Sequence, residues 1–334
     1  MIYKRLTNVE REIIREQLTL GTSPSNIAVM LGRSRSTVSR ELQRGGHGTE
    51  QGYRACIAHA GAQHAASSRR GGKRKLDRNV ELWNVVATKL KLRWSPKQIE
   101  QYLVLTFSHE PTMRITAESI YTYVYVQAKG ALKKVMIDYL RRSKPRRTAR
   151  HVNRSGPRRG VIPEMISIER RPAEVEGRTV PGHWEGDLVL GAGNKSAIGT
   201  LVERSTRWAI LVKLTTKDAS AVRRAFAREM RRLPEELAKS LTYDQGKEMA
   251  QHQLFTKQTK IKVYFAHPHS PWERGTNENT NGLVRDFYPA GTDFNTVSRA
   301  QLKRVQQMLN ERPRKTLNWQ TPSQKFSELV ALNT

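Results

Sequence analysis

Residues 183–190, His-Trp-Glu-Gly-Asp-Leu-Val-Leu, are the segment that most constrains what this chain can fold into. Their apolar character and alternation predict a β-strand, in which successive side chains point to opposite faces. Asp187 then shares a face with Glu185, while Trp184 and Leu188 lie on the other. A carboxylate in the middle of a buried strand must lose its charge, pair with a cation or bind a metal. The fold therefore has to supply a partner for Asp187.

Two later acids complete a candidate metal site with Asp187. Asp244 ends a second short apolar run, residues 240–244, and Glu278 lies in an Asn-Glu-Asn-Thr-Asn-Gly stretch that is typical of the first turns of a helix. The stretch 245–277 between them is the spacing on which this prediction depends most. Three carboxylates at one place repel one another unless a cation lies between them, and oxygen ligands suit a hard divalent cation.

The assignment of the third acid has rivals. Glu185 shares the strand face of Asp187, and Glu273 lies shortly before Glu278. We favour Glu278 because its surroundings can open a helix, whereas Glu273 lies in a loop containing Pro and Trp. Two turns beyond Glu278, on the same helical face, Arg285 either holds a phosphate or is an ordinary surface arginine.

The charge of the chain predicts a polyanionic partner. Among 334 residues there are 59 Lys and Arg against 30 Asp and Glu, a formal net charge of +29. A membrane is the rival polyanion, but no apolar run approaches the roughly 20 residues that span a bilayer. The first residues also lack the apolar core of a signal peptide. One cysteine, Cys56, leaves no internal disulfide and fits a reducing compartment. We therefore expect double-stranded DNA as partner, no membrane, and a cytoplasmic protein.

Residues 6–45 predict three short helices, the last beginning after the cap residue Ser34. The second and third are joined by a glycine turn, which is typical of a helix-turn-helix whose final helix enters the major groove. That helix turns small polar and basic side chains outward, and we take these as DNA-binding: Arg35, Ser36, Thr37 and Arg40. The plainer alternative is a three-helix bundle without a DNA role.

Residues 81–130 carry a weaker copy of this pattern. Ser95 and Pro96 repeat the earlier helix start, and Thr116 caps a further helix. A second helix-turn-helix would place Ser119 and Thr122 near DNA, together with Glu118 and Tyr125. The alternative is a helical spacer, because the connection is long for this motif.

From residue 177 onward, strands and helices alternate. Segments 183–190, 196–203 and 208–214 predict an antiparallel meander, and strands ending at 244 and 265 add to it with helices between. This pattern predicts a mixed five-stranded sheet with helices on its faces, the ribonuclease H-like arrangement. A helix over 298–311 is expected to turn Leu302 inward and Arg312 outward.

The chain resembles transposases of the IS30 family, which belong to the DDE group of ribonuclease H-like recombinases. The resemblance rests on Leu-Gly-Arg-Ser-Arg-Ser-Thr-Val-Ser-Arg-Glu-Leu (31–42), His-Trp-Glu-Gly-Asp (183–187), Thr-Tyr-Asp-Gln-Gly-Lys-Glu (242–248) and Pro-Trp-Glu-Arg-Gly-Thr-Asn-Glu-Asn-Thr-Asn-Gly (271–282). It implies that Asp187, Asp244 and Glu278 are the catalytic acids and the metal ligands. Gln245 departs from the basic residue expected at its position, which leaves the acids intact.

The resemblance also implies a reaction and its partners. We expect two Mg²⁺ ions, with Mn²⁺ as a substitute, that support strand cleavage at terminal inverted repeats and transfer of the strand to target DNA. Two ends must be joined, so a homodimer or higher multimer on the DNA is expected, in the nucleoid of a bacterial cell. Two other functions stay open: a DNA-binding regulator with an inactive scaffold, and a structure-specific nuclease.

The predicted organisation is therefore multidomain, with N-terminal all-α helix-turn-helix units followed by an α/β ribonuclease H-like catalytic domain that contains a mixed five-stranded sheet. We expect a helix-turn-helix domain over residues 1–52, a basic linker over 53–80, a second helix-turn-helix domain over 81–140, a second basic linker over 141–176 and the catalytic domain over 177–334.

Overall fold

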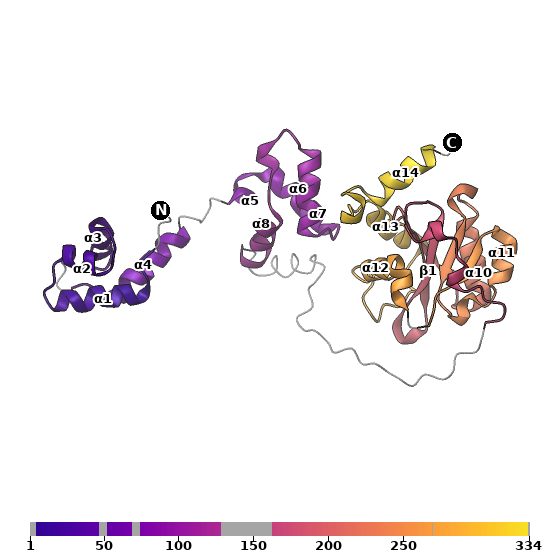
Figure 1. Ribbon diagram of the computed structural model, residues 1–334, viewed down its shortest axis with the longest axis horizontal. Helices are drawn as coiled ribbons and strands as arrows, with labels where there is room; N and C mark the ends of the chain where they lie inside the picture. Colours follow the sequence, from indigo (N-terminus) through magenta and orange to yellow (C-terminus); the bar gives the residue numbers. More distant parts are fainter. Residues whose placement is uncertain (1–4, 47–51, 69–73, 128–161, 269, 333–334) are drawn as a thin grey trace. The chain divides into compact units, whose positions relative to one another are not determined.

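The computed structural model describes residues 5–46, 52–68, 74–127, 162–268 and 270–332 (Figure 1). The chain forms two compact units, Met1–Trp83 and Asn84–Thr334. Most of the predicted second basic linker, and the end of the predicted second helix-turn-helix domain, lie outside the described residues.

The first unit is helical. Its main helices are α1 (Asn8–Thr19), α2 (Pro24–Met30), α3 (Arg35–Arg44) and α4 (Ala55–Ser68), followed by the short α5 (Lys75–Arg78) and by α6 (Val80–Lys91), which crosses into the second unit. Ser34 caps α3 as predicted, by accepting a hydrogen bond from the Thr37 amide. Ile14, Ile27 and Val38 are fully buried in one core. The predicted helices of residues 6–45 are therefore present.

The predicted second helix-turn-helix lies partly in the second unit. It contains α7 (Pro96–Thr106), η1 (Pro111–Met113), α8 (Ala117–Thr122) and η2 (Tyr123–Gln127). Ser95 and Gln98 form the predicted capping box at the start of α7. The Nε2 of Gln98 also donates to the Pro313 carbonyl at 2.8 Å, which ties α7 to the C-terminal segment.

A mixed five-stranded sheet forms the centre of the second unit, as predicted. Its strands are β1 (His183–Leu190), β2 (Ala197–Glu203), β3 (Ala209–Lys213), β4 (Ser240–Tyr243) and β5 (Lys262–Phe265), in the order β3-β2-β1-β4-β5. The first three strands pair antiparallel, whereas β4 and β5 add in parallel. The meander and the later strands follow the alternation of the sequence.

Helices cover both faces of this sheet. They are α10 (Ala219–Met230), α11 (His252–Thr259), α12 (Gly275–Val284) and α13 (Arg299–Asn310). The last helix, α14 (Pro322–Leu332), stacks Phe326 on Trp208 with 4.9 Å between the ring centroids. Short 3₁₀ turns join the elements at η3 (Ile168–Arg170), η4 (Ala173–Val175), η5 (Ala192–Asn194), η6 (Glu235–Leu237), η7 (Lys247–Met249), η8 (Pro271–Arg274) and η9 (Lys315–Leu317). None of the described helices has the length and apolar character needed to cross a bilayer.

The alternation along β1 separates two cores. Trp184 packs with Phe226 of α10 and Phe255 of α11, whereas Val189 packs with Leu283 of α12 and with α13. The predicted two faces of the strand are therefore confirmed. The face that carries Val189 is also the face of Glu185 and Asp187, so α12 lies over the acids.

Helix α13 also closes the outer edge of β3. The side chain of Asn310 accepts from the Ala209 amide at 2.9 Å and donates to the Ala209 carbonyl at 2.8 Å, and Gln306 accepts from the Leu211 amide at 2.9 Å. These side chains replace the hydrogen bonds that a neighbouring strand would otherwise supply.

Arg312 contradicts the sequence prediction. Its side chain is fully buried rather than turned outward. The guanidinium lies over the ring of Phe287, at 5.6 Å from its centroid, and donates to the carbonyl of Leu92 at 3.4 Å. The prediction failed because it extended the helical face of 298–311 past the end of α13 at Asn310, where the chain turns toward the segment before α7.

Candidate active site

Three separate segments bring the predicted acids together. Asp187 lies in β1, Asp244 directly follows β4, and Glu278 lies in the first turn of α12. Parallel pairing aligns Glu185 of β1 with Thr242 of β4, so both segments carry an acid two residues further on, at the same end of the pair. Helix α12 packs on β1 and β2 and adds the third carboxylate.

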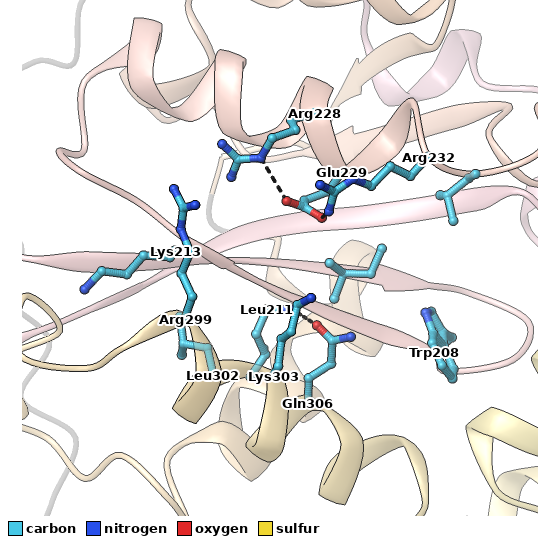
Figure 2. Close-up of a pocket in the computed structure, with 12 residues that line it drawn as sticks. Trp208, Leu211, Lys213, Arg228, Glu229, Arg232, Arg299, Leu302, Lys303 and Gln306 are labelled. Carbon is cyan, nitrogen blue, oxygen red and sulfur yellow. Dashed lines mark hydrogen bonds and ion pairs between the residues drawn. The ribbon is translucent and has the colours of Figure 1, made fainter.

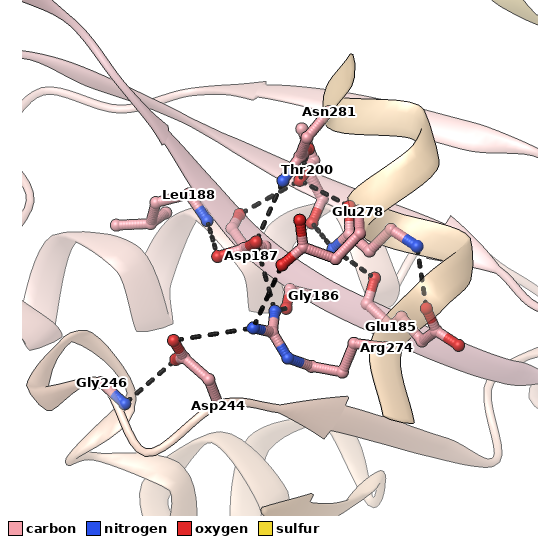
Figure 3. Close-up of polar contacts among 11 residues, drawn as sticks. Glu185, Gly186, Asp187, Leu188, Thr200, Asp244, Gly246, Arg274, Glu278 and Asn281 are labelled. Carbon is pink, nitrogen blue, oxygen red and sulfur yellow. Dashed lines mark hydrogen bonds and ion pairs between the residues drawn. The ribbon is translucent and has the colours of Figure 1, made fainter. Parts of the chain in front are cut away.

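One guanidinium lies among the three carboxylates. Arg274 of η8 places Nη1 3.2 Å from Oδ2 of Asp187, and Nη2 3.7 Å from Oδ2 of Asp244 and 3.9 Å from Oε1 of Glu278 (Figure 3). The Arg274 side chain is 8% exposed, whereas those of the acids are 19%, 37% and 46% exposed in the same order. A single buried cation therefore offsets the mutual repulsion of the acids.

Asp187 is the most constrained of the three acids. Its Oδ2 accepts from Nδ2 of Asn281 at 3.0 Å, and its Oδ1 accepts from the Leu188 amide at 2.8 Å. Burial raises the pKa of Asp187 to about 6; the charge of Arg274 opposes this rise and the charge of Asp244 adds to it. Even with Arg274 beside it, the Asp187 carboxylate thus takes up a proton more readily than an ordinary aspartate does.

Asp244 lies at the mouth of an open cavity. Its Oδ1 accepts from the Gly246 amide at 3.0 Å, and a Cβ on Gly246 would come within 2.8 Å of the same oxygen, so a larger residue here would displace the Asp244 carboxylate. The cavity has a volume of 330 Å³ and is also lined by Asp187, Lys247 and Glu248. Asp187 and Asp244 are therefore open to a ligand from this side.

Both rival acids have other partners. Glu185 is fully buried; its carboxylate accepts from Nη1 of Arg204 at 2.5 Å and from the Asn277 amide at 2.8 Å. Glu273 accepts from the backbone amide of His267 and contacts its Nδ1, each at 2.8 Å. Glu185 thus caps α12 and Glu273 fixes a loop, and neither contacts Arg274 in the way that Glu278 does.

The sequence prediction missed Arg274 and Asn281. Arg274 lies one helical turn before Glu278, and its i,i+4 relation to that acid is the signal that could have identified it. Asn281 lies one turn after Asn277 on the same face, within the quoted Asn-rich motif. Both residues fix the acids without being acids themselves.

Arg285 does not join the acids. It follows the end of α12, and its Nη2 donates to the Leu190 carbonyl at 2.6 Å, which ties the helix to the end of β1. Burial lowers the pKa of Arg285. Its role in holding a phosphate stays a prediction.

The predicted DNA-reading residues lie on the surfaces expected of them. On α3, the side chains of Arg35, Ser36 and Arg40 are exposed, and that of Thr37 is half-buried. On α8, Ser119 and Thr122 are exposed. The structure contains no DNA, so their contacts with bases stay predictions.

The donor set suits a hard divalent cation. It consists of carboxylate oxygens alone, and they already surround a positive charge. Among the described residues, no three acidic, His or Cys side chains are close enough together to hold a metal in the present arrangement, because Arg274 separates them. A metal would therefore take over the charge that Arg274 now provides.

A second concavity runs along β3 between α10 and α13, with a volume of 390 Å³ (Figure 2). Its floor is apolar, and its rim carries the cations Lys213, Arg228, Arg232, Arg299 and Lys303. Glu229 lies between Arg228 and Arg232 and binds both. None of the three clustered acids lines this groove, so it is separate from the candidate active site.

Known proteins resemble this chain over nearly its full length. Residues 3–45 match a helix-turn-helix domain family and residues 178–271 an integrase core domain family. The chain is 42% identical over 330 residues to the transposase for insertion sequence element IS1086 of Cupriavidus metallidurans, covering 98% of this chain and 96% of the relative. It is 43% identical over 328 residues to the transposase InsI for insertion sequence element IS30A of Escherichia coli, covering 98% and 84%. The chain belongs to the IS30 family of transposases.

This transposase also matches the catalytic core domain of BIV integrase among solved structures, with a TM-score of 0.36, 16% identity, and coverage of 46% of this chain and 97% of that one. The predicted family, fold class and function in DNA transposition are confirmed by the relatives and the matched families. The chain is a polynucleotidyl transferase that binds DNA, with the general divalent-metal dependence of integrase cores. The integrase core match ends before Glu278.

The raised pKa of Asp187 gives a testable pH dependence. Folding raises this pKa from an ordinary value near 3.8 to about 6, so the charged carboxylate destabilises the metal-free fold above about pH 6, and this penalty disappears toward about pH 4. Asp187→Asn, which is neutral at every pH, should be more stable than the parent by about 1–3 kcal/mol near pH 7.5, and by less near pH 5. Thermal unfolding with a chelator at both pH values measures this, and a lower Tm of the variant near pH 7.5 would contradict it.

Removing the shared cation should have the opposite effect. Arg274→Gln leaves three carboxylates without their counter-ion and should lower the stability of the metal-free protein near pH 7.5 by about 2 kcal/mol. The control is Arg224→Gln, an exposed arginine of α10 that contacts only Ser220 among the described residues. Denaturant unfolding of the two variants in the presence of a chelator compares them, and equal midpoints would show that Arg274 does not hold the acids.

Proposed function

We propose that this transposase is a DDE enzyme in which Asp187, Asp244 and Glu278 are the catalytic acids and bind two Mg²⁺ ions, with Mn²⁺ able to replace them. The observation that carries this proposal is the convergence of three carboxylates, from β1, the end of β4 and α12, on one buried cation. Both rival acids are held by other partners, which supports Glu278 as the third member.

Bound Mg²⁺ would supply activation of the attacking oxygen and stabilisation of the leaving oxygen. The chain itself positions the acids: Asn281 and the Leu188 amide hold the Asp187 carboxylate, and the Gly246 amide holds that of Asp244. Glu278 is fixed by α12, whose first turn is anchored to β1 through Asn277 and Glu185. These contacts hold the three acids around Arg274, and binding of Mg²⁺ would draw them closer together.

The proposed reaction has two phosphoryl-transfer steps. In the first, water attacks the phosphodiester at a terminal inverted repeat, the P–O3′ bond breaks, and the transposon end is left with a free 3′-hydroxyl. In the second, this hydroxyl attacks a target phosphodiester, a new P–O bond forms, and a target 3′-hydroxyl leaves with a proton. Neither step needs a covalent protein intermediate.

Recognition of the DNA would be divided among several elements. Arg35, Ser36, Thr37 and Arg40 of α3 would read the inverted repeat, Ser119 and Thr122 of α8 would add a second contact, and Arg285 would hold a phosphate. Since two transposon ends must be joined, the active form would be a homodimer or higher multimer on DNA. The cytoplasmic, nucleoid-associated location also remains a prediction.

Substitution of the acids tests the proposal. Asp187→Asn, Asp244→Asn and Glu278→Gln should each reduce cleavage of labelled inverted-repeat DNA by roughly 1000-fold or more, about 4 kcal/mol in activation free energy, while DNA binding persists. Glu273→Gln is the matched control, because Glu273 is bound to His267, and it should stay close to the parent.

The products of the same assay separate the possible functions. Mg²⁺-dependent cleavage followed by joined products supports a transposase of the proposed mechanism. Cleavage without joining would identify a nuclease, and binding without cleavage a regulator. Full activity of any acid variant would refute the site assignment.

A further inference from the structure

Three arginines lie around the first turn of α12, directly before Glu278, and a fourth contacts the strand β4. Nη1 of Arg204 lies 3.4 Å from the Glu273 carbonyl, and Nη1 of Arg207 donates to Oγ1 of Thr276 at 2.6 Å. Nη2 of Arg178 lies 3.8 Å from the point where a Cβ would stand on Gly275. The fourth, Arg171, donates from Nη1 to Oγ1 of Thr242 on β4 at 3.2 Å. We call these four residues the arginine cluster.

The arginine cluster contains more positive charge than its neighbours neutralise. Glu185 forms an ion pair with Arg204, and the other three arginines form no ion pair within 4 Å in the part of the chain that the structure describes. Their hydrogen-bond acceptors are neutral hydroxyl oxygens, as the contacts of Arg171 and Arg207 show. The positive charges of these arginines are therefore offset only by carboxylates that lie beyond ion-pair distance.

The other nearby acids have partners or are exposed. Glu203 is buried, and its Oε2 accepts from the Thr206 amide at 2.6 Å and from the Ser205 hydroxyl at 2.9 Å. Glu273 is bound to His267, and Glu176 is exposed to solvent. Their carboxylates reduce the electrostatic field of the arginine cluster but form no ion pair with it within 4 Å among the described residues.

The crowding of positive charge affects the pKa and the hydrogen bonding of the guanidinium groups. Burial lowers the pKa of Arg204 to about 10; Glu185 opposes this shift, and Arg171, Arg178 and Arg207 add to it. Among the described residues, the buried Nε atoms of Arg171 and Arg204 have no hydrogen-bond partner, and the side chain of Arg204 is only 4% exposed. Unpaired buried donors and unneutralised charge at one place are the conditions that a bound oxyanion relieves.

The arginine cluster adjoins the candidate active site. Glu185, which pairs with Arg204, lies two residues before Asp187 on the same face of β1. Thr276, which accepts from Arg207, lies in the helical turn that carries Glu278. A DNA strand whose scissile phosphate reaches the acids would thus have a neighbouring phosphate close to the cluster.

We propose that the arginine cluster binds a phosphodiester group of the DNA strand that enters the acid site. Planar guanidinium groups bind phosphate oxygens with paired hydrogen bonds, which suits a cluster of arginines better than one of lysines. This inference rests on the proposed function, since it assumes that DNA is cut at Asp187, Asp244 and Glu278. The cluster would set the register of the strand in the site without reading its sequence.

The test uses the full-length protein and a labelled inverted-repeat duplex in the presence of a chelator, so that binding is measured without catalysis. The double variant Arg178→Gln/Arg207→Gln removes two half-buried members of the cluster and leaves the Arg204–Glu185 pair intact. Over about 50–300 mM salt, the slope of log K against log salt should become shallower by about 0.9 for one lost phosphate contact. Affinity near 100 mM salt should fall about tenfold.

The matched control is Arg224→Gln/Arg231→Gln, which removes two exposed arginines of α10 and its end. It changes the net charge equally and should leave the slope close to that of the parent. If the cluster variant and the control lose affinity and slope to the same extent, only net charge matters and the proposal is wrong.

A second variant covers the case in which the glutamines disturb folding, which thermal unfolding would reveal. Arg178→Lys/Arg207→Lys keeps both charges but removes the paired donors, so affinity should fall a few-fold with an unchanged slope; no loss of affinity would overturn the proposal. Stabilisation of the parent by inorganic phosphate, without any change of slope in the variants, would assign the cluster to a free anion instead of DNA.

These outcomes are separate from those of the acid variants. If Asp187→Asn still cleaves DNA while the arginine variants lose the phosphate contact, the proposed catalytic site fails and the phosphate site stands. If the acid variants are inactive and the arginine variants bind as the parent does, the proposed function stands and the phosphate site fails.

Discussion

The placement of a buried carboxylate in the central strand is the constraint on which the catalytic half depends. Asp187 can be charged there only if a cation is near, and Arg274 supplies it while also contacting Asp244 and Glu278. The parallel pairing of β1 with β4 brings Asp187 and Asp244 close to Arg274, and the packing of α12 on β1 adds Glu278. In the structure the positive charge of the Arg274 guanidinium lies between the acids, and it offsets their mutual repulsion.

A second ion pair sets the position of the helix that carries the third acid. Glu185 and Arg204 are buried together, and Glu185 also accepts from the first turn of α12. The same strand face therefore holds one acid that fixes the helix and, two residues later, one that faces the ligand cavity. The two carboxylates differ in role because their partners differ, as Asp187 retains access to the open side and Glu185 does not.

Local patterns predicted most of the fold. The alternation in 183–190, the turns between the first three strands and the cap at Ser34 each depend on neighbouring residues, and each is found in the structure. What failed or was missed depends on residues distant in sequence. Arg312 is buried against partners such as Leu92, which lies before α7. Arg274 lies near both Asp187 and Asp244 only because β1 and β4 are neighbours in the sheet. The sequence offered both Glu185 and Glu278 as candidates for the third acid. Their roles are distinguished only by their partners in the structure: Arg204 binds Glu185, and Arg274 lies near Glu278.

The closed edges of the sheet limit how copies of this transposase can associate. Asn310 and Gln306 occupy peptide groups of Ala209 and Leu211 on β3, and at the opposite margin the Phe265 amide is taken by the carbonyl of Ile166. At these positions the backbone groups of the edge strands are already hydrogen-bonded, so a strand of a second copy cannot pair with them. In the proposed multimer, the protomers would therefore meet through side-chain surfaces and not through these strand edges.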